Sequence, residues 1–241
     1  PPLPGSAFSP PSEIAMFSLP PHRVEALVED GLPGAETLPE NLQFRSYRHP
    51  EDLEALVAAH EAAFRDHWGH VEQSHDYLRQ RWQHRLETDP LFDPNLLFLA
   101  VTRSGGEIAG HCYCRIEEEG APGYGFVAVL GVVPAHRRRG VGRALLGHGL
   151  RALYERGKQA VSLVVDGSSL TGATRLYEDL GMHVAHSFTV WERLLRDGAE
   201  LALVELVDYN DVQPAGTGSG NALKVETYQR PDSSDVTFAP N

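Results

Sequence analysis

The sequence predicts a mixed α/β fold, and three observations lead to this prediction. An apolar run over residues 127–133 ends at Pro134 and is followed by a helical pattern that starts at Val141. A second apolar run, 161–165, precedes another helical segment. Nearer the N-terminus, short strand-like runs are separated by glycine-rich turns. Strand and helix periods thus alternate along the chain, which favours a sheet covered by helices.

The composition is typical of a soluble globular domain with extensions. Hydrophobic residues make up 41% of the chain and charged residues 22%, while the net charge of −12 argues against a nucleic-acid or anionic-membrane surface. No segment has the length of a membrane span, and the N-terminus lacks a signal-peptide layout, so we expect a cytoplasmic protein. Cys112 and Cys114 lie two apart in a predicted strand and are expected to be core thiols; no metal site is predicted.

Residues 1–40 are predicted to be an N-terminal extension or linker. They hold many of the chain's prolines and glycines, which favour irregular, extended backbone. Within them we expect Ile14–Leu19 to be extended, with Phe17 docked in an apolar groove on the surface of the following domain. The first strand of that domain is predicted at Gln43–Tyr47.

Two helices are predicted next, with an irregular loop between them. The first begins at His49–Asp52, where a proline and two acids occupy the first turn, and its apolar stripe runs to Phe64. The second is capped by Ser74 and runs to about Leu86. The loop carries His67 among other polar and aromatic residues. It is interpreted either as part of an acceptor pocket or as a surface loop.

The remaining strands are bounded by turn residues. Leu96–Thr102 and Glu107–Glu117 are predicted to form a hairpin around Ser104–Gly106. A further strand, His183–Leu195, is expected to close the edge of the sheet. No role is assigned to residues 197–241, a C-terminal extension.

The junction between the central strand and its helix is a candidate anion site. The first amide N–H groups of a helix lack intrahelical partners and carry the positive end of the dipole. Gly140 and Gly142 let a phosphate approach the backbone, and arginines surround the turn. A Walker A loop is excluded because Arg143 and Ala144 follow Gly142. An arginine run alone also suits a solvated turn, but this context favours a pyrophosphate.

The pattern Arg137-x-x-Gly140-x-Gly142 resembles the acyl-CoA-binding motif of the GNAT superfamily of N-acetyltransferases. Residues 171–182, TGATRLYEDLGM, match the same family's A-x-x-L-Y-x-x-x-G-F/M signature. The resemblance covers roughly residues 41–196, which are therefore expected to form a GNAT acyltransferase domain. It implies a mixed, mostly antiparallel central sheet that splays at the cofactor site, with helices on both faces.

The resemblance also implies a set of site residues. Acetyl-CoA would be the co-substrate, backbone amides of the central strand would hold the thioester carbonyl, and Tyr177 would protonate the departing thiolate. A tyrosine at this position also suits packing on the sheet. The residues expected to bind acetyl-CoA are Leu130, Val132, Val133, Arg137, Arg138, Arg139, Gly140, Val141, Gly142, Arg143 and Thr171.

The general base is not identified by the motif. An acidic residue often stands on the central strand in this family, but the corresponding residues here are Ala128 and Val129. Glu117 and His67 are the candidate catalytic bases, with His70 as a third, and solvent could instead deprotonate the amine.

The predicted function is acyl-CoA-dependent transfer of an acetyl group to a primary amine of a small molecule. Two alternatives stay open: a non-catalytic acyl-CoA-binding module that acts as a sensor or structural partner, and an interaction domain with a vestigial cofactor site. The chain resembles the C-terminal half of tandem GNAT proteins, a group that includes mycothiol synthase. The resemblance therefore leaves a homodimer or a tandem-domain partner open. Neither nucleic acid nor a membrane is expected to be a partner.

Overall fold

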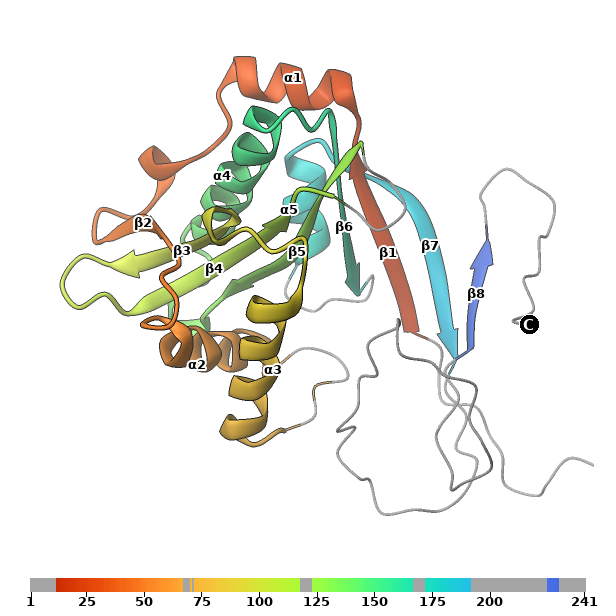
Figure 1. Ribbon diagram of the computed structural model, residues 1–241. Helices are drawn as coiled ribbons and strands as arrows, with labels where there is room; N and C mark the ends of the chain where they lie inside the picture. Colours follow the sequence, from red (N-terminus) through yellow and green to blue (C-terminus); the bar gives the residue numbers. More distant parts are fainter. Residues whose placement is uncertain are drawn as a thin grey trace, which may run out of the picture.

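The computed structural model describes residues 12–66, 70, 72–117, 123–166 and 172–191, together with the backbone of 225–229. One eight-stranded sheet, in the order β2-β3-β4-β5-β6-β1-β7-β8, has helices on both faces (Figure 1). The strands are β1 (Ser12–Leu19), β2 (Leu42–Ser46), β3 (Leu97–Thr102), β4 (Ile108–Arg115), β5 (Tyr124–Val132), β6 (Ala160–Asp166), β7 (His183–Trp191) and β8 (Val225–Gln229). The helices are α1 (Pro21–Asp30), α2 (Leu53–Phe64), α3 (His75–Thr88), α4 (Val141–Glu155) and α5 (Ala173–Asp179), with short 3₁₀ turns at η1 (Ala35–Thr37), η2 (Pro94–Leu96) and η3 (Pro134–His136). The predicted mixed α/β fold is confirmed.

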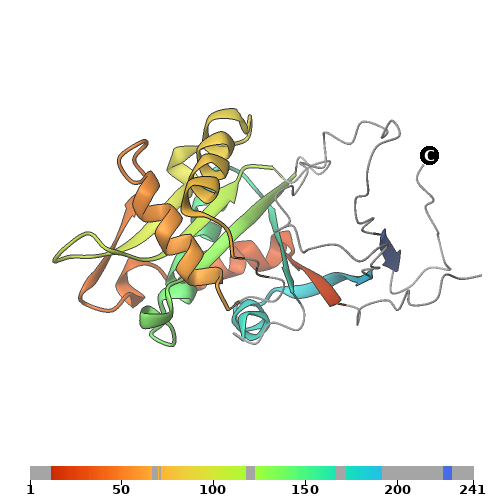
Figure 2. The same cartoon turned by 90° about the horizontal axis from the view of Figure 1, so that it is seen from below.

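Two hydrophobic cores lie on opposite faces of the sheet. Helices α2 and α3 cover one face, and α4 with α1 and α5 covers the other (Figure 2). Successive residues of β4 contribute to different cores: Cys112 packs on the α4 side and Tyr113 on the α2 side. This alternation follows from the two-residue period of a strand, and it explains why β4 is buried on both faces.

The sheet opens between β5 and β6. These two strands pair in parallel only from Tyr124 to Phe126, and all other pairs among the described strands are antiparallel. Just beyond Phe126, the register between β5 and β4 shifts. Cys114 pairs with Val127, whereas the preceding residue, Tyr113, pairs with Val129. A bulge of this kind leaves Ala128 unpaired and bends the strand. The predicted splay of the central strand is therefore present, and it begins at the bulge.

Strand β1 corrects the expectation for the N-terminal segment. Its backbone is extended and Phe17 is buried, as expected, but the segment does not lie in a surface groove. It pairs with β6 through Phe17 and Leu163 and with β7 through Phe17 and Val184, so it is an inner strand of the sheet. The local sequence signalled extended backbone; the pairing with strands about 150 residues later is set by tertiary contacts. The sheet thus includes residues that precede the predicted domain start at residue 41.

Of three further local predictions, one is confirmed and two are corrected. Ser74 caps α3 by accepting a hydrogen bond from the Tyr77 amide at 3.3 Å, as predicted. Helix α2 begins at Leu53 and not at His49, because the Asp52 carboxylate is held by Arg45 at 2.8 Å in a turn that precedes the helix. Strand β7 does not close the sheet, since β8 pairs outside it.

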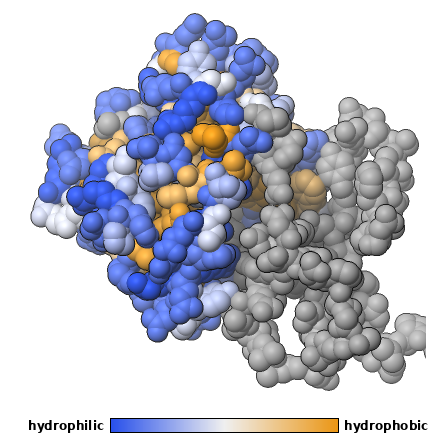
Figure 3. All heavy atoms as spheres, in the orientation of Figure 1, coloured by the Kyte–Doolittle hydropathy of each residue, from blue (hydrophilic) through white to orange (hydrophobic). Residues whose placement is uncertain are grey.

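Hydrophilic side chains dominate the face shown in Figure 3, and hydrophobic ones gather toward its middle. Within the described ranges, no helix combines the length and apolar character needed to cross a membrane. Cys112 and Cys114 are both buried free thiols whose sulfur atoms lie 3.7 Å apart, as expected for core cysteines.

Gly147→Ala is expected to destabilise the protein, although alanine is the better helix former. A Cβ atom at this position of α4 would lie 2.0 Å from the Pro33 carbonyl oxygen, so the backbone of one segment must shift. Overpacking typically costs about 1–3 kcal/mol, which lowers the melting temperature of a domain this size by several degrees. Gly105→Ala is the matched control, because its nearest neighbour, Thr102 Oγ1, is 3.9 Å away. A higher melting temperature for Gly147→Ala would mean that helix propensity, worth about 1 kcal/mol, decides the outcome instead.

Candidate functional site

The turn between β5 and α4 presents an unobstructed helix N-terminus. Gly140 is the N-cap of α4 with φ of 81°, a left-handed conformation that glycine adopts without strain, and no side chain caps the helix. The first intrahelical bond runs from the Ala144 amide to the Gly140 carbonyl at 3.0 Å, which leaves the preceding amides without helical partners. Arg138 has φ of 59° and is the one non-glycine with positive φ among the described residues. Left-handed residues that alternate with right-handed ones turn amides inward and form an anion-binding nest.

The arginines of this turn divide into two roles. The Arg137 guanidinium donates to the Val132 carbonyl at 3.0 Å, to the Ala63 carbonyl at 2.9 Å and to the Asp66 carboxylate at 2.8 Å. It therefore ties the end of β5 to the end of α2, and the Asp66 carboxylate raises its pKa further above the ordinary arginine value. Arg138, Arg139 and Arg143 are exposed around the nest. These three place positive charge at the surface of the turn, with Arg139 donating to Asn41 Oδ1 at 3.2 Å, while Arg137 ties the turn to α2.

The splayed edge of β5 offers backbone amides on its open side. The Val133 amide donates to the Ala109 carbonyl of β4 at 3.0 Å, so it is engaged and is not open to a thioester. In an antiparallel ladder successive residues point their N–H groups to opposite sides. The amides of Leu130 and Val132 therefore point away from β4, toward the gap that β6 has left. Within the segment Leu130 to Val133, which the resemblance implies for the thioester carbonyl, Leu130 and Val132 therefore have outward-facing amides.

Helix α5 brings the second signature motif to the same place. A Cβ atom at Gly142 would lie 3.5 Å from Val132 Cγ2 and 3.6 Å from Leu176 Cδ2, so strand end, helix start and α5 meet. Tyr177 follows on α5 with its ring buried against Phe17 at a centroid distance of 5.4 Å. Burial, with a smaller contribution from Cys112, raises the pKa of Tyr177 to about 12. The phenol thus stays protonated at neutral pH and is able to donate a proton or hydrogen bond.

The candidate bases are not brought together. Cys112 pairs with Leu130, whereas Arg115 pairs with Phe126, so β4 runs roughly 10 Å along its length before it ends. Glu117 lies beyond that end, away from Leu130 and Val132, and is half-buried. His67 and Thr171 lie outside the described residues, and His70 is exposed.

A histidine pair that sequence reasoning missed lies beneath the open edge of β5. His60 Nδ1 on α2 and His111 Nε2 on β4 are 3.2 Å apart, so one ring donates to the other. His111 is opposite Gly131 in the ladder, and its Cε1 would be 2.7 Å from a Cβ at that glycine. Among described residues, His111 Nδ1 has no hydrogen-bond partner. The sequence signal was weak, because the two histidines are 51 positions apart and each sits in an apolar pattern.

Acidification from pH 7 to pH 5 is expected to destabilise the protein through this pair. Burial lowers the pKa of His60 to about 3 and the pKa of His111 to about 4. Both lie below the unfolded value of about 6.5, so the unfolded chain binds protons first. Stability is therefore complete above about pH 6.5 and falls as the pH drops toward the folded values. At pH 5 one such histidine accounts for a loss of about 2 kcal/mol.

The melting temperature as a function of pH checks this expectation. His60→Gln should flatten the decrease between pH 7 and pH 5, whereas His75→Gln, at an exposed pair with Glu54, should not. The pKa of His148 is also lowered by burial, so some decrease remains in the variant. An unchanged slope in His60→Gln would contradict the assignment.

The sequence is similar to that of known acetyltransferases. Residues 53–182 match the acetyltransferase (GNAT) family. A mycothiol acetyltransferase from Thermobispora bispora is 39% identical over 163 residues, which cover 66% of this chain and 50% of that protein. One from Kineococcus radiotolerans is 41% identical over 140 residues, 58% of this chain and 42% of that protein. The chain spans about half the length of the curated relatives it matches.

Solved structures support the same fold. A GCN5-related N-acetyltransferase from Sphaerobacter thermophilus aligns with a TM-score of 0.60 and 31% identity, over 81% of this chain and 55% of that one. A tandem GNAT protein from the clavulanic acid biosynthesis pathway aligns with a TM-score of 0.58 over 78% of this chain and 55% of that one. At 16% identity the latter likeness concerns the fold alone.

Proposed function

Because the chain belongs to the GNAT family of acetyltransferases, whose co-substrate is acetyl-CoA, we propose that it transfers an acetyl group from acetyl-CoA to a primary amine of a small molecule. The observation that carries this proposal is that the uncapped N-terminus of α4, the open edge of β5 and helix α5 meet around Gly142. Tyr177 follows Leu176 on α5.

Each part has one task in direct transfer. The α4 amides, Gly142 and the exposed arginines bind the pyrophosphate, where the helix dipole favours negative charge. The amides of Leu130 and Val132 donate to the thioester carbonyl and stabilise the oxyanion that forms when the amine attacks. Tyr177 donates to the departing thiolate, and its raised pKa keeps the proton on the phenol until that charge develops. The proton that the amine loses on attack passes to solvent, which also returns a proton to Tyr177. Acetyl-CoA itself supplies the activated acyl group.

The matched relatives also suggest a wider context for the chain. They are named mycothiol acetyltransferases, and the chain corresponds to about half of their length. We propose that a second domain or a second subunit acts beside this one, and that the acceptor is a small molecule. The alternative of a non-catalytic acyl-CoA-binding module is favoured by Ala128 and Val129, which occupy the strand positions where an acid often stands.

Release of free thiol from acetyl-CoA in the presence of an amine panel tests the proposal. Saturable, amine-dependent release is the expected result, together with a rise in melting temperature on addition of CoA. A rise in melting temperature without release by any amine would instead support the binding module. If CoA neither raises the melting temperature nor binds in calorimetry, the cofactor site is vestigial.

A further inference from the structure

A small cavity between α2 and α3 is lined mainly by basic and aromatic side chains. Its walls are His60, Leu78, Arg81, Trp82 and Arg85, and its volume is about 30 Å³. That is room for roughly two waters or one small anionic group, not for a whole substrate. The rings are tightly arranged, since the His60 and Trp82 centroids are 5.0 Å apart and Arg85 Cζ lies 5.6 Å from the Trp82 ring.

The two arginines of this cavity have no acidic partner among the described residues. The nearby carboxylate of Asp89 is already committed, because it pairs with Arg115 at 3.5 Å and accepts from the Tyr113 hydroxyl at 3.2 Å. Arg79 on the same helix differs, since it pairs with Glu54 of α2. Burial, and next the charge of Arg81, lower the pKa of Arg85. Half-buried cations that repel one another favour an anion between them. This contrasts with the net charge of −12.

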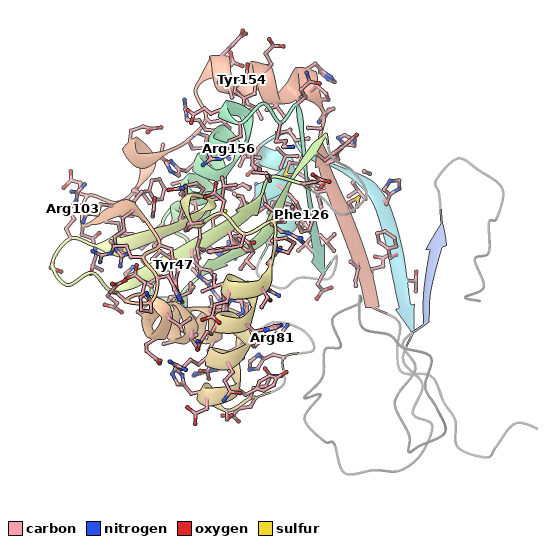
Figure 4. All side chains as sticks on the ribbon, viewed as in Figure 1. Tyr47, Arg81, Arg103, Phe126, Tyr154 and Arg156 are labelled. Carbon is pink, nitrogen blue, oxygen red and sulfur yellow. The ribbon has the colours of Figure 1, made fainter. Side chains whose placement is uncertain are left out.

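The cavity is linked to β5 through two imidazole rings. His60 in its wall contacts His111 at 3.2 Å, and His111 faces Gly131 in the ladder. Gly131 stands between Leu130 and Val132, whose amides border the open edge. Arg81 extends from the flank of α3 in Figure 4. The cavity is thus two side chains away from the backbone proposed to hold the thioester.

We propose that Arg81 and Arg85 bind an anionic group, a carboxylate or phosphate, on the amine that accepts the acetyl group. This inference rests on the proposed function and narrows its substrate class to amines that carry a negative charge. Two guanidinium groups suit such anions because each offers paired N–H donors in a planar fork. Trp82 and Leu78 would contact the carbon chain that joins the anion to the amine.

Two matched pairs of amines test the proposal on the full chain. 6-Aminohexanoate is compared with hexylamine, and 6-aminohexyl phosphate with 6-aminohexanol, by calorimetric binding in the presence of CoA and by thiol release from acetyl-CoA. The longer chains are needed because the His60 and His111 ring centroids, which separate the cavity from β5, are 5.4 Å apart. We expect the anionic member of at least one pair to bind about 10–100-fold more tightly, the size of one or two charge-assisted hydrogen bonds. A preference within the first pair indicates a carboxylate, and a preference within the second pair indicates a phosphate.

Variants of the arginines on α3 test whether these side chains cause the preference for anionic amines. Arg81→Met and Arg85→Met keep most of the apolar stem and should each reduce the preference about tenfold, while Arg85→Lys retains part of it. Arg79→Met is the control, because two residues place its side chain about 200° around the helix from Arg81. Equal binding of charged and uncharged amines, or an equal loss in Arg79→Met, overturns the proposal. An anionic amine that binds without any thiol release supports the anion site and contradicts the acetyltransferase function.

Discussion

Gly142→Glu is expected to abolish binding of acetyl-CoA while the protein remains folded. The new Cβ atom makes only ordinary contacts, 3.5 Å to Val132 and 3.6 Å to Leu176. An acid in the first turn of a helix is also favourable for the helix itself. The same carboxylate, however, would lie where the pyrophosphate is proposed to bind. Two like charges about 4 Å apart near a protein surface repel by about 4 kcal/mol, which corresponds to about a thousandfold loss of affinity.

Two further variants at this position separate charge from bulk. Gly142→Gln has the size of glutamate without its charge, and Gly142→Ala adds a single methyl group that the neighbouring atoms accommodate. We expect affinity for acetyl-CoA, measured by calorimetry, to fall in the order alanine, glutamine, glutamate. Unchanged affinity in a folded Gly142→Glu protein would rule out the α4 N-terminus as the pyrophosphate site.

The strand, turn and helix around this glycine could be predicted because their signals are local. The change from an apolar run to a helical period, with Pro134 and Gly140 between them, fixes β5 and α4 without knowledge of any distant residue. The position of β1 could not be predicted in the same way. Its extended conformation is local, but its neighbours in the sheet are β6 and β7, and register between remote strands is decided by burial of residues such as Phe17.

The roles of charged side chains were harder to predict than the elements that carry them. Arg137 belongs to a run of arginines, and nothing in that run indicates that one guanidinium turns back to Asp66 and Ala63 while the others stay exposed. Asp66 stands 71 positions earlier in the chain. The pairing of His60 with His111 is equally remote. Such contacts depend on how α2 packs on the sheet, which sequence periodicity describes only as an apolar face.

Tyr177→Phe is expected to lower kcat by roughly 10²–10⁴-fold, the usual contribution of a general acid. The change removes one hydroxyl and almost no volume, so packing of the ring on Phe17 should be retained. No described side chain hydrogen-bonds to this hydroxyl, so its loss should change the free energy of unfolding by less than about 1 kcal/mol. The Michaelis constant for acetyl-CoA should stay the same, because the proton is needed only as the thiolate departs.

Rates of thiol release and melting temperatures of the two proteins distinguish catalysis from packing. A phenol with a pKa of about 12 remains protonated across the neutral range, so Tyr177 itself should add no titration to the rate between pH 6 and pH 9. The rate deficit of Tyr177→Phe should therefore be constant over that range. A deficit that disappears toward low pH would mean that solvent protonates the thiolate. Equal kcat with a lower melting temperature in Tyr177→Phe would remove Tyr177 from the mechanism and leave it as a core residue that packs on Phe17.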